Sequence, residues 1–148
     1  MNVEEIIKTE KKIPLESRTI IHLSLVNNHI HEVITATLKP FEVSLQQFNV
    51  LRILRGQKGK PANLSTLNER MVSKMSNTTR LVDKLITKEF VDRIVCPSNR
   101  RKVEIRITPS GEKALAKMDV AMKEAERHVL KNLVPHDLQQ LNDLLDKF

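Results

Sequence analysis

Several residue types are scarce or missing in this chain of 148 residues, and each absence removes a class of function. The sequence has no Trp or Tyr and only four Phe, which argues against stacked aromatic platforms for single-stranded nucleic acid. Its one cysteine, Cys96, excludes an internal disulfide framework and fits a reducing cytoplasm. With three glycines, the chain has little material for a phosphate-binding or catalytic loop.

Long apolar runs and catalytic motifs are missing as well. No run approaches the roughly 20 residues of a membrane span. The first residues, MNVEEIIKTEKK, lack the apolar centre of a signal peptide. The sequence contains no nucleophile elbow, paired cysteines or His-Glu ligand spacing. We therefore expect a soluble cytoplasmic protein that is not an enzyme, carries no cofactor and has no membrane partner.

The histidines do not make a convincing metal set. His22 and His29 are seven residues apart and can share one face of a helix, but His31 is off that face. No carboxylate completes a ligand set, so solvated or interfacial histidines are expected and no metal is predicted.

Positive charge is in excess, and it is confined to one segment. The formal net charge is +7 and the sequence pI is about 9.7. Residues 44–108 carry 14 Lys and Arg against 5 Asp and Glu, a net charge of +9, whereas residues 1–43 and 109–148 each have a net charge of −1. Such confinement is expected of a segment that faces phosphate groups. A solvated basic face without a ligand is the alternative interpretation.

The first half of the stretch Ser73–Thr108 has the spacing of an amphipathic helix. We predict a helix over residues 74–88 with Ser73 as its N-cap. The inward positions, spaced by three and four residues, are Met75, Thr78, Val82, Leu85 and Ile86. The polar positions that point the other way are Ser76, Asn77, Arg80, Asp83, Lys84 and Thr87.

The second half of this stretch changes to a period of two, which is typical of strands with one covered face. The alternating residues are Val91, Arg93 and Val95, followed by Val103, Ile105 and Ile107. Between them, residues 97–102 form a predicted turn that contains three consecutive cations. A polar-faced helix followed by a basic-tipped hairpin indicates a winged helix-turn-helix, with the helix in the major groove and the tip at a minor groove.

The segment before this stretch supplies the other helices of such a core. A long helix is predicted from Ser17 to Leu38, stopped by Lys39-Pro40, after an extended or fraying arm over residues 1–14. Ser44 and Gln47 read as a capping box for a second helix that ends at Gly56 and Gly59. Its predicted buried face is Leu45, Phe48, Leu51 and Leu54. Asn63 is predicted to cap a short helix over residues 64–71.

The C-terminal region predicts two more helices. Thr108 can cap a helix with Pro109 at its first position, and Pro135 ends it before a last helix with a leucine stripe that runs to Phe148. The apolar stripe of the first of these helices is Leu115, Met118, Met122, Ala125, Val129 and Leu133. Because such a stripe needs a cover, we predict a homodimer, with packing within the chain against the first predicted helix, residues 17–38, as the alternative.

These elements in order, with SNTTRLVDKL in the predicted helix and NRRKVEIRITPSG after it, resemble the MarR (multiple antibiotic resistance) family of transcriptional regulators from about Ser17 to Phe148. The wing signature of that family, Asp-x-Arg and then Leu-Thr-x-x-Gly, appears here as Asn99-Arg100-Arg101 and Ile107-Thr108-Pro109-Ser110-Gly111. Asn99 replaces the usual aspartate and Glu89 replaces a glycine that usually closes the recognition helix. The usual glycine near residues 71–73 is also absent.

The resemblance implies a mainly α fold with a small β-hairpin wing. Residues 1–40 would be an arm and a dimerisation helix, 41–108 the winged helix-turn-helix, and 109–148 further dimerisation helices. It also implies an interlocked homodimer on a pseudo-palindromic operator. An effector pocket would lie between the dimer helices and the DNA-binding core, so that a small molecule releases the repressor.

The candidate DNA contacts come from the predicted helix and from the wing tip. Asn77 could pair with adenine and Arg80 with guanine or phosphate, whereas Lys74 and Lys84 are expected on phosphates. Arg101 matches the minor-groove arginine of the family. The full candidate set is Lys74, Ser76, Asn77, Arg80, Lys84, Asn99, Arg100, Arg101 and Lys102.

One alternative function and the role of the cysteine are left to consider. The basic winged helix could bind acidic protein partners instead of specific DNA. Cys96, at the base of the wing, is interpreted as a small, partly buried residue instead of a redox switch.

Overall fold

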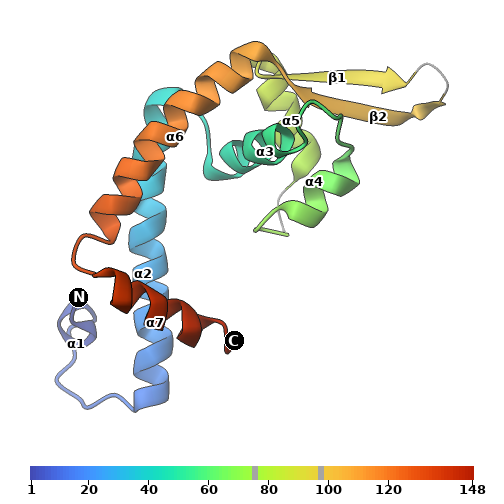
Figure 1. Ribbon diagram of the computed structural model, residues 1–148. Helices are drawn as coiled ribbons and strands as arrows, with labels where there is room; N and C mark the ends of the chain where they lie inside the picture. The colour runs from blue at the N-terminus through green and yellow to red at the C-terminus, as the bar shows by residue number, and fades with distance from the viewer. Residues whose placement is uncertain (75–76, 97–98) are drawn as a thin grey trace. The chain divides into compact units, whose positions relative to one another are not determined.

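The computed structural model describes residues 1–74, 77–96 and 99–148, and for residues 96 and 100–102 it describes the backbone alone. Its elements are α1 (Val3–Ile6), α2 (Leu15–Leu38), the 3-10 turn η1 (Lys39–Phe41), α3 (Leu45–Gly56), α4 (Leu64–Arg70), α5 (Thr78–Thr87), β1 (Val91–Cys96), β2 (Asn99–Ile107), α6 (Pro109–Val129) and α7 (Pro135–Leu145) (Figure 1). The predicted fold class is confirmed, since the protein is mainly helical with one antiparallel hairpin. The backbone forms two compact units, residues 37–124 and residues 1–36 with 125–148.

The starts of α3 and α4 follow the predicted caps. The Ser44 hydroxyl accepts the backbone N–H of Gln47 at 3.2 Å, and the side-chain Oε1 of Gln47 accepts the backbone N–H of Ser44 at 2.8 Å. The Asn63 carboxamide accepts the N–H of Thr66 at 2.8 Å. Each cap satisfies an N–H that has no partner within its helix, so these helix starts are set by local sequence. Both predictions are confirmed.

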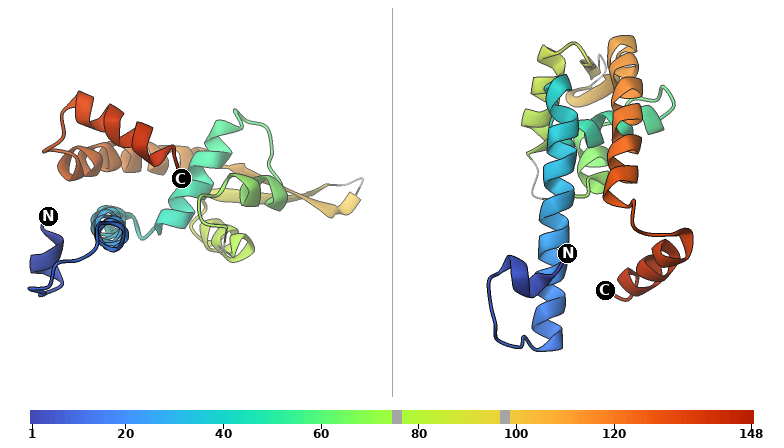
Figure 2. Two further views of the ribbon diagram at one scale, coloured as in Figure 1. Left: turned by 90° about the horizontal axis from the view of Figure 1, so that it is seen from below. Right: turned by 90° about the vertical axis from the view of Figure 1, so that its left-hand side faces the viewer.

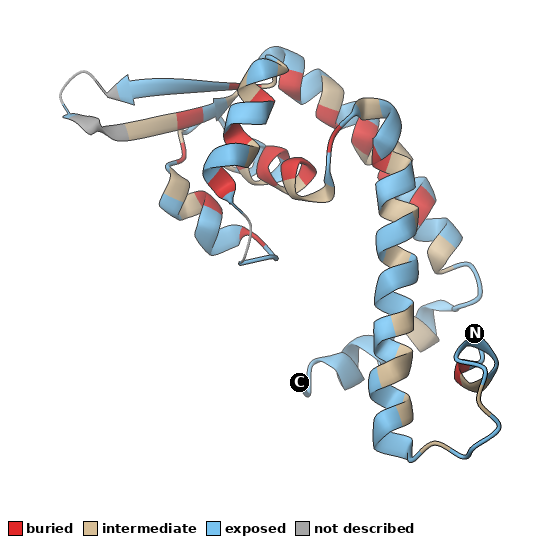
Figure 3. Ribbon diagram, turned by 180° about the vertical axis from the view of Figure 1, so that it is seen from behind, coloured by how far each residue is buried: buried red, intermediate tan, exposed pale blue. Residues whose placement is uncertain are grey.

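The unit of residues 37–124 has a continuous apolar core, seen as the red positions on α3, α5 and the start of α6 (Figure 3). Its fully buried large side chains come from every helix of the unit and from both strands. They are Leu38, Val50, Leu51, Leu67, Met71, Val82, Leu85, Val91, Ile105, Leu115 and Met118. Of the predicted inner face of α3, Phe48, Leu51 and Leu54 are buried and Leu45 is intermediate.

The hairpin pairs Val91 with Ile107 and Val95 with Val103, and its register shifts between Val95 and Cys96. Ala62, just before α4, exchanges two backbone hydrogen bonds with Ile105, at 2.9 and 2.7 Å. These bonds fix the root of the wing to the helices. The far end projects beyond them, as Figure 1 and the left view of Figure 2 show.

Two predictions about the hairpin are wrong. Val95 was predicted on a covered face but is 49% exposed, because only the root of the hairpin packs on the helices. The predicted turn over residues 97–102 is also too long, since β2 begins at Asn99. Cys96 at the end of β1 pairs with Asn99, so the backbone of residues 100–102 lies within β2.

Helix α6 ends at Val129, earlier than predicted, and Leu133 lies in the connection to α7 with 39% of its surface exposed. Thr108 caps α6 as predicted, since its hydroxyl accepts the N–H of Gly111 at 2.9 Å. The first part of the α6 stripe is buried within the single chain, at Leu115, Met118, Met122 and Ala125. This part of the stripe is therefore covered within the chain, whereas the alternative that named the first helix as its cover stays a prediction.

The unit of residues 1–36 and 125–148 is different, because Val3 and Ala125 are its only buried apolar side chains. The long helix α2 is present and begins at Leu15 instead of Ser17. Figure 3 shows this helix as exposed or intermediate along most of its length. Among the described residues, no helix has the length and apolar character needed to cross a membrane.

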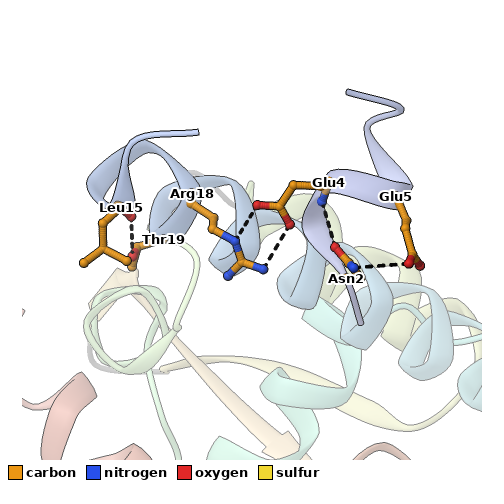
Figure 4. A network of polar contacts seen from close by, with 6 residues as sticks. All are labelled: Asn2, Glu4, Glu5, Leu15, Arg18 and Thr19. Carbon is orange, nitrogen blue, oxygen red and sulfur yellow. Dashed lines mark hydrogen bonds and ion pairs between the residues drawn. The ribbon is translucent and has the colours of Figure 1, made fainter. Parts of the chain in front are cut away.

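Residues 3–6 of the N-terminal arm form a short helix, which the prediction of an extended or fraying arm over residues 1–14 did not include. Asn2 caps the short helix α1 by accepting the N–H of Glu4 at 3.1 Å, and Val3 is fully buried. The Glu4 carboxylate accepts two hydrogen bonds from the Arg18 guanidinium, at 2.7 and 3.1 Å (Figure 4). These hydrogen bonds lower the pKa of Glu4 and raise that of Arg18. Sequence reasoning missed this contact because α1 is too short to show a helical period.

Candidate nucleic-acid interface

Helix α5 begins later than predicted, at Thr78, and Asn77 is its N-cap. The Asn77 carboxamide oxygen accepts the backbone N–H of Arg80 at 3.1 Å. The prediction of Ser73 as the cap is therefore wrong. Both residues are cap formers, and the helix begins after Asn77, where Thr78 is buried and hydrogen bonds to Asn68 of α4.

This start changes the role available to Asn77. A bidentate pair with adenine uses both the oxygen and the nitrogen of the carboxamide, and the oxygen already accepts one hydrogen bond in the cap. The side chain is exposed, so its nitrogen is still available to an acceptor. Thr79 takes the exposed first-turn position instead. Sequence reasoning missed Thr79 because it placed the helix start too early.

Packing against α4 sets which face of α5 is free. The Thr78 hydroxyl hydrogen bonds to the Asn68 carboxamide of α4, and Thr78 is buried. Val82 and Leu85 are buried on the same side. The opposite side of α5 presents Arg80, Asp83, Lys84 and Thr87 to solvent, as predicted.

The cations of this face have different surroundings. Arg80 and Lys84 form no ion pair with any described residue, whereas Asp83 is paired with Arg93 of β1 at 3.2 Å. The single acid on the face is thus offset by a guanidinium from the wing. What remains on α5 is a net positive surface made by Arg80 and Lys84.

Lys74 is less available than predicted. Its ammonium donates to the carbonyl oxygen of Glu69 at 2.6 Å and approaches that of Asn68 at 3.4 Å. It therefore closes the C-terminus of α4, where free carbonyls and the helix dipole attract a cation.

Several other cations of the basic segment are also used within the fold. Lys88 pairs with Glu42 at 3.3 Å, Arg106 with Glu104 at 3.5 Å, and Arg55 with Asp119. Glu42 and Asp119 lie outside residues 44–108, so the net charge of that segment overstates the charge that a ligand would meet.

The wing brings the remaining candidates together along one strand. Asn99 opens β2 opposite Cys96 and its side chain is exposed. Arg100, Arg101 and Lys102 follow it in the strand, and the positions of their side chains lie outside the described part of the protein, as does that of Cys96. Ser76 also lies outside the described residues.

The end of α5 is tied to the start of α6. Glu89, at the position where a glycine was expected, has a left-handed φ of 60°. This conformation costs a residue other than glycine roughly 1 kcal/mol. The Thr108 hydroxyl donates to the Glu89 carbonyl at 2.7 Å. Helix α5 is thus held by hydrogen bonds at its end as well as at its start, and this fixes the position of its exposed cations.

Among the described residues, no group of His, Cys, Asp and Glu side chains is arranged to hold a metal ion.

The family comparison adds an independent finding. The sequence model of the MarR family matches residues 43–103, which span α3 to β2. The chain is 28% identical over 109 residues to the uncharacterized HTH-type transcriptional regulator YpoP of Bacillus subtilis, covering 74% of this chain and 72% of YpoP. It is 24% identical over 124 residues to the HTH-type transcriptional repressor IacR of Pseudomonas putida, covering 84% of this chain and 73% of IacR.

The fold is shared with solved structures that extend beyond the matched segment. BpsR of Bordetella bronchiseptica superposes with a TM-score of 0.79 at 18% identity, over 93% of this chain and 96% of BpsR. Regulation of DNA binding by 6-hydroxynicotinic acid is described for BpsR. At this identity the likeness establishes the fold of the present chain.

Proposed function

Because this chain belongs to the MarR family of DNA-binding transcriptional regulators, we propose that it acts as a homodimeric repressor on a pseudo-palindromic operator. The observation that carries the proposal is the free face of α5, where two cations without acidic partners stand on a helix fixed at both ends. A rigid helix with such a face fits the major groove of B-DNA.

The proposed contacts follow from this geometry. Arg80 and Thr79, near the start of α5, reach base edges or phosphates, and Lys84 reaches a phosphate one turn further on. Asn77 contributes its carboxamide nitrogen while its oxygen keeps the cap. Lys74 acts mainly through the fold, because its ammonium already binds α4.

The proposed wing contacts rest on the charge and position of residues 99–102. Three consecutive cations next to the tip of a projecting hairpin suit the phosphate-lined minor groove. Arg101 is the proposed minor-groove residue, with Arg100, Lys102 and Asn99 on the flanking backbone.

The proposed homodimer is supported by the unit of residues 1–36 and 125–148. Two buried apolar side chains cannot stabilise a unit of this size, given the entropy lost on folding. Its exposed large apolar side chains offer a surface for a second copy. They include Leu15, Ile20, Leu23, Val26, Leu133, Val134, Leu141, Leu144, Leu145 and Phe148. A symmetric dimer would also present two recognition helices to two half-sites.

Repression and release by an effector are proposed from the relatives. IacR is a repressor, and DNA binding by BpsR is regulated by a small acid. We extend both properties to this chain as a non-enzymatic regulator. The named relatives are bacterial, and chromosomal DNA in bacteria lies in the cytoplasm, so we place its action there.

The test is selection of duplexes from a random pool, followed by fluorescence anisotropy across a salt series. We expect one enriched inverted repeat and steeply salt-dependent affinity. Arg80→Ala and Arg101→Ala should each lower affinity for the selected duplex by about 1–3 kcal/mol. Arg127→Ala, at an exposed position of α6, is the control. A protein that binds no duplex, or binds all duplexes equally, would instead support the protein-interaction alternative.

A further inference from the structure

Helix α3 has a second face that the core does not use. Asn49, Arg52, Ile53 and Gly56 are spaced by three and four residues, so they share one side of the helix. The buried residues of α3 lie on the other side. With a rise of 1.5 Å per residue, the free stripe is about 10 Å long, which is two helical turns.

This stripe forms one wall of a groove, and Arg70 and Val72 form the other. The volume of the groove is about 330 Å³. Arg70 is the last residue of α4, and α3 and α4 contact each other within the unit of residues 37–124 (Figure 1). None of the lining residues belongs to α5 or to the hairpin, so the groove is separate from the proposed DNA contacts.

The two arginines of the groove lack acidic partners. Arg52 and Arg70 are both exposed, and neither forms an ion pair with any described residue. Glu69, the acid next to Arg70, instead accepts a hydrogen bond from the Ser65 hydroxyl at 3.1 Å. Two guanidinium groups without a counter-charge give the groove a positive potential, which attracts acidic groups.

One of these arginines is held in place by the core. The guanidinium carbon of Arg52 lies 5.7 Å from the centre of the Phe48 ring, and Phe48 is buried. Stacking on a fixed ring limits the motion of the guanidinium and leaves its N–H edge available. A carboxylate side chain matches such an edge, because it can accept two parallel hydrogen bonds from it.

The groove also has an apolar part, and this part decides between a protein and a nucleic acid as its occupant. Ile53 is partly exposed on one wall, and Val72 is 87% exposed on the other. A phosphate backbone would contact the arginines and leave both apolar side chains in water. A protein segment with carboxylates beside a large apolar side chain would use the arginines and the apolar walls together.

The shape of the groove favours a helix as this segment. No strand lines the groove, so an extended peptide would find no free strand edge to pair with. The stripe on α3 instead has the spacing that meets the side chains of another helix laid along it. Gly56 leaves room for a close approach, because even an added Cβ there meets no atom within 4 Å.

We propose that this groove docks an acidic amphipathic helix of a partner protein. Carboxylates of that helix bind Arg52 and Arg70, and an apolar side chain between them packs against Ile53 and Val72. This goes beyond the proposed function, since it adds a protein partner to a regulator that binds DNA. Because the contact covers only about two helical turns, the complex is expected to be weak and transient.

The probe is a displayed library of random peptides, selected on the full-length protein and counter-selected on the double variant Arg52→Gln/Arg70→Gln. We expect enriched peptides to carry Asp or Glu on both sides of a large apolar residue, at helical spacing. Enrichment of no peptide family, or of peptides that bind the double variant equally well, overturns the proposal.

Single variants then locate the binding of the most enriched peptide, measured by fluorescence anisotropy. Arg52→Gln and Arg70→Gln should each weaken it about tenfold or more, and Val72→Ser should weaken it severalfold. Arg127→Gln, at an exposed arginine of α6 outside the groove, should not change it. These positions are exposed, so circular dichroism and thermal unfolding should stay like those of the native protein.

An exchange of charges gives a readout that loss of structure cannot imitate. The enriched peptide with its acids replaced by Lys should bind the native protein at least tenfold more weakly than the original. The same Lys peptide should bind Arg52→Glu/Arg70→Glu better than it binds the native protein. If the charge exchange restores no binding, the arginines do not contact the peptide and the proposal is wrong.

Two further measurements test the other occupants of the groove. The enriched peptide should still bind when the protein is saturated with its selected duplex. If the duplex displaces the peptide, and Arg52→Gln and Arg70→Gln reduce the salt dependence of duplex binding, the arginines are phosphate contacts and the proposal is wrong. If these variants instead change the sedimentation of the native protein, a second copy fills the groove and the proposal is also wrong.

Failure of this proposal is distinguishable from failure of the proposed function. A protein that binds the enriched peptide through the groove but binds no duplex lacks only the DNA-binding function. A protein that binds its selected duplex but enriches no groove-dependent peptide lacks only the docking site.

Discussion

At the scale of single residues, the pairing of charges decides which cations are available to a ligand. The basic segment has many more cations than its surface offers, because four of its described Lys and Arg residues pair with carboxylates. Asp83 is the informative case. It stands on the exposed face of α5 between Arg80 and Lys84, and Arg93 offsets its charge at 3.2 Å.

Removing Arg93 should therefore weaken DNA binding through Asp83. Arg93→Ala leaves a carboxylate facing the phosphates, and we expect roughly tenfold weaker operator binding, about 1.4 kcal/mol. Stability should change by less than about 1 kcal/mol, because both side chains are partly exposed. Anisotropy and urea unfolding measure the two quantities.

The double variant Asp83→Asn/Arg93→Ala should recover most of the lost affinity, since the unpaired charge is gone. Lys88→Ala, which breaks a comparable pair with Glu42 away from this face, is the control. If the double variant binds as weakly as Arg93→Ala, Arg93 touches DNA itself.

The close packing of Gly111 against the backbone of Phe90 leads to a second prediction at the scale of residues. A Cβ added to Gly111 would lie 2.1 Å from the Phe90 carbonyl oxygen, whereas one added to Gly56 meets nothing within 4 Å. Gly111→Ala should cost at least about 2 kcal/mol of unfolding free energy, because one backbone segment has to move. Gly56→Ala should add up to about 1 kcal/mol, since alanine is the better helix former. Equal stabilities in urea unfolding would contradict this packing.

At the scale of elements, contacts between segments distant in the sequence decide where helices begin and end. The sequence around α5 contains several cap formers, and the buried Thr78 selects Asn77 among them. The arm that precedes α2 is a similar case. Its order depends on Glu4 and Arg18, which lie 14 residues apart.

The arm should loosen in acid. The hydrogen bonds from Arg18 place the pKa of Glu4 below its ordinary value of 4.5, so the contribution of the ion pair is complete above pH 4.5 and is lost as the pH falls through the folded pKa. Amide hydrogen exchange of residues 3–9 should show lower protection in acid. In Glu4→Gln, protection should be low already at neutral pH, and an unchanged pH dependence in that variant would assign the effect to another group.

At the scale of the whole molecule, the two units differ in how well a single chain can stabilise them. The unit of residues 37–124 has a closed core, whereas the unit of residues 1–36 and 125–148 buries only Val3 and Ala125 among its apolar side chains. Apolar surface of this extent usually marks an interface.

We expect the native protein to sediment as a dimer. Leu141→Glu, in the exposed stripe of α7, should shift it toward the monomer and lower operator affinity at the same time, because half-site binding loses one recognition helix. His136→Glu adds a carboxylate at an exposed position on the opposite face of α7 and should leave both properties unchanged. Monomeric native protein with full operator affinity would refute the dimer.

The sequence by itself determined the order and kind of most elements, the caps at Ser44, Asn63 and Thr108, and the confinement of positive charge to residues 44–108. These properties depend on residues within one or two turns of each other, where spacing and hydrogen-bonding chemistry are enough. The polar face of α5 could be predicted for the same reason.

Only the tertiary structure decided where α5 begins and which nearby cations, such as Lys74 and Arg93, already have partners. It also decided that most of the α6 stripe is buried within one chain. The structure also brings Arg52 of α3 beside Arg70 at the end of α4, and no local pattern reports that nearness. The physical reason is common to all of these. A cap, an ion pair or a buried stripe is selected by the free energy of contacts between distant segments, and a linear pattern records what a residue can do but not which partner it meets.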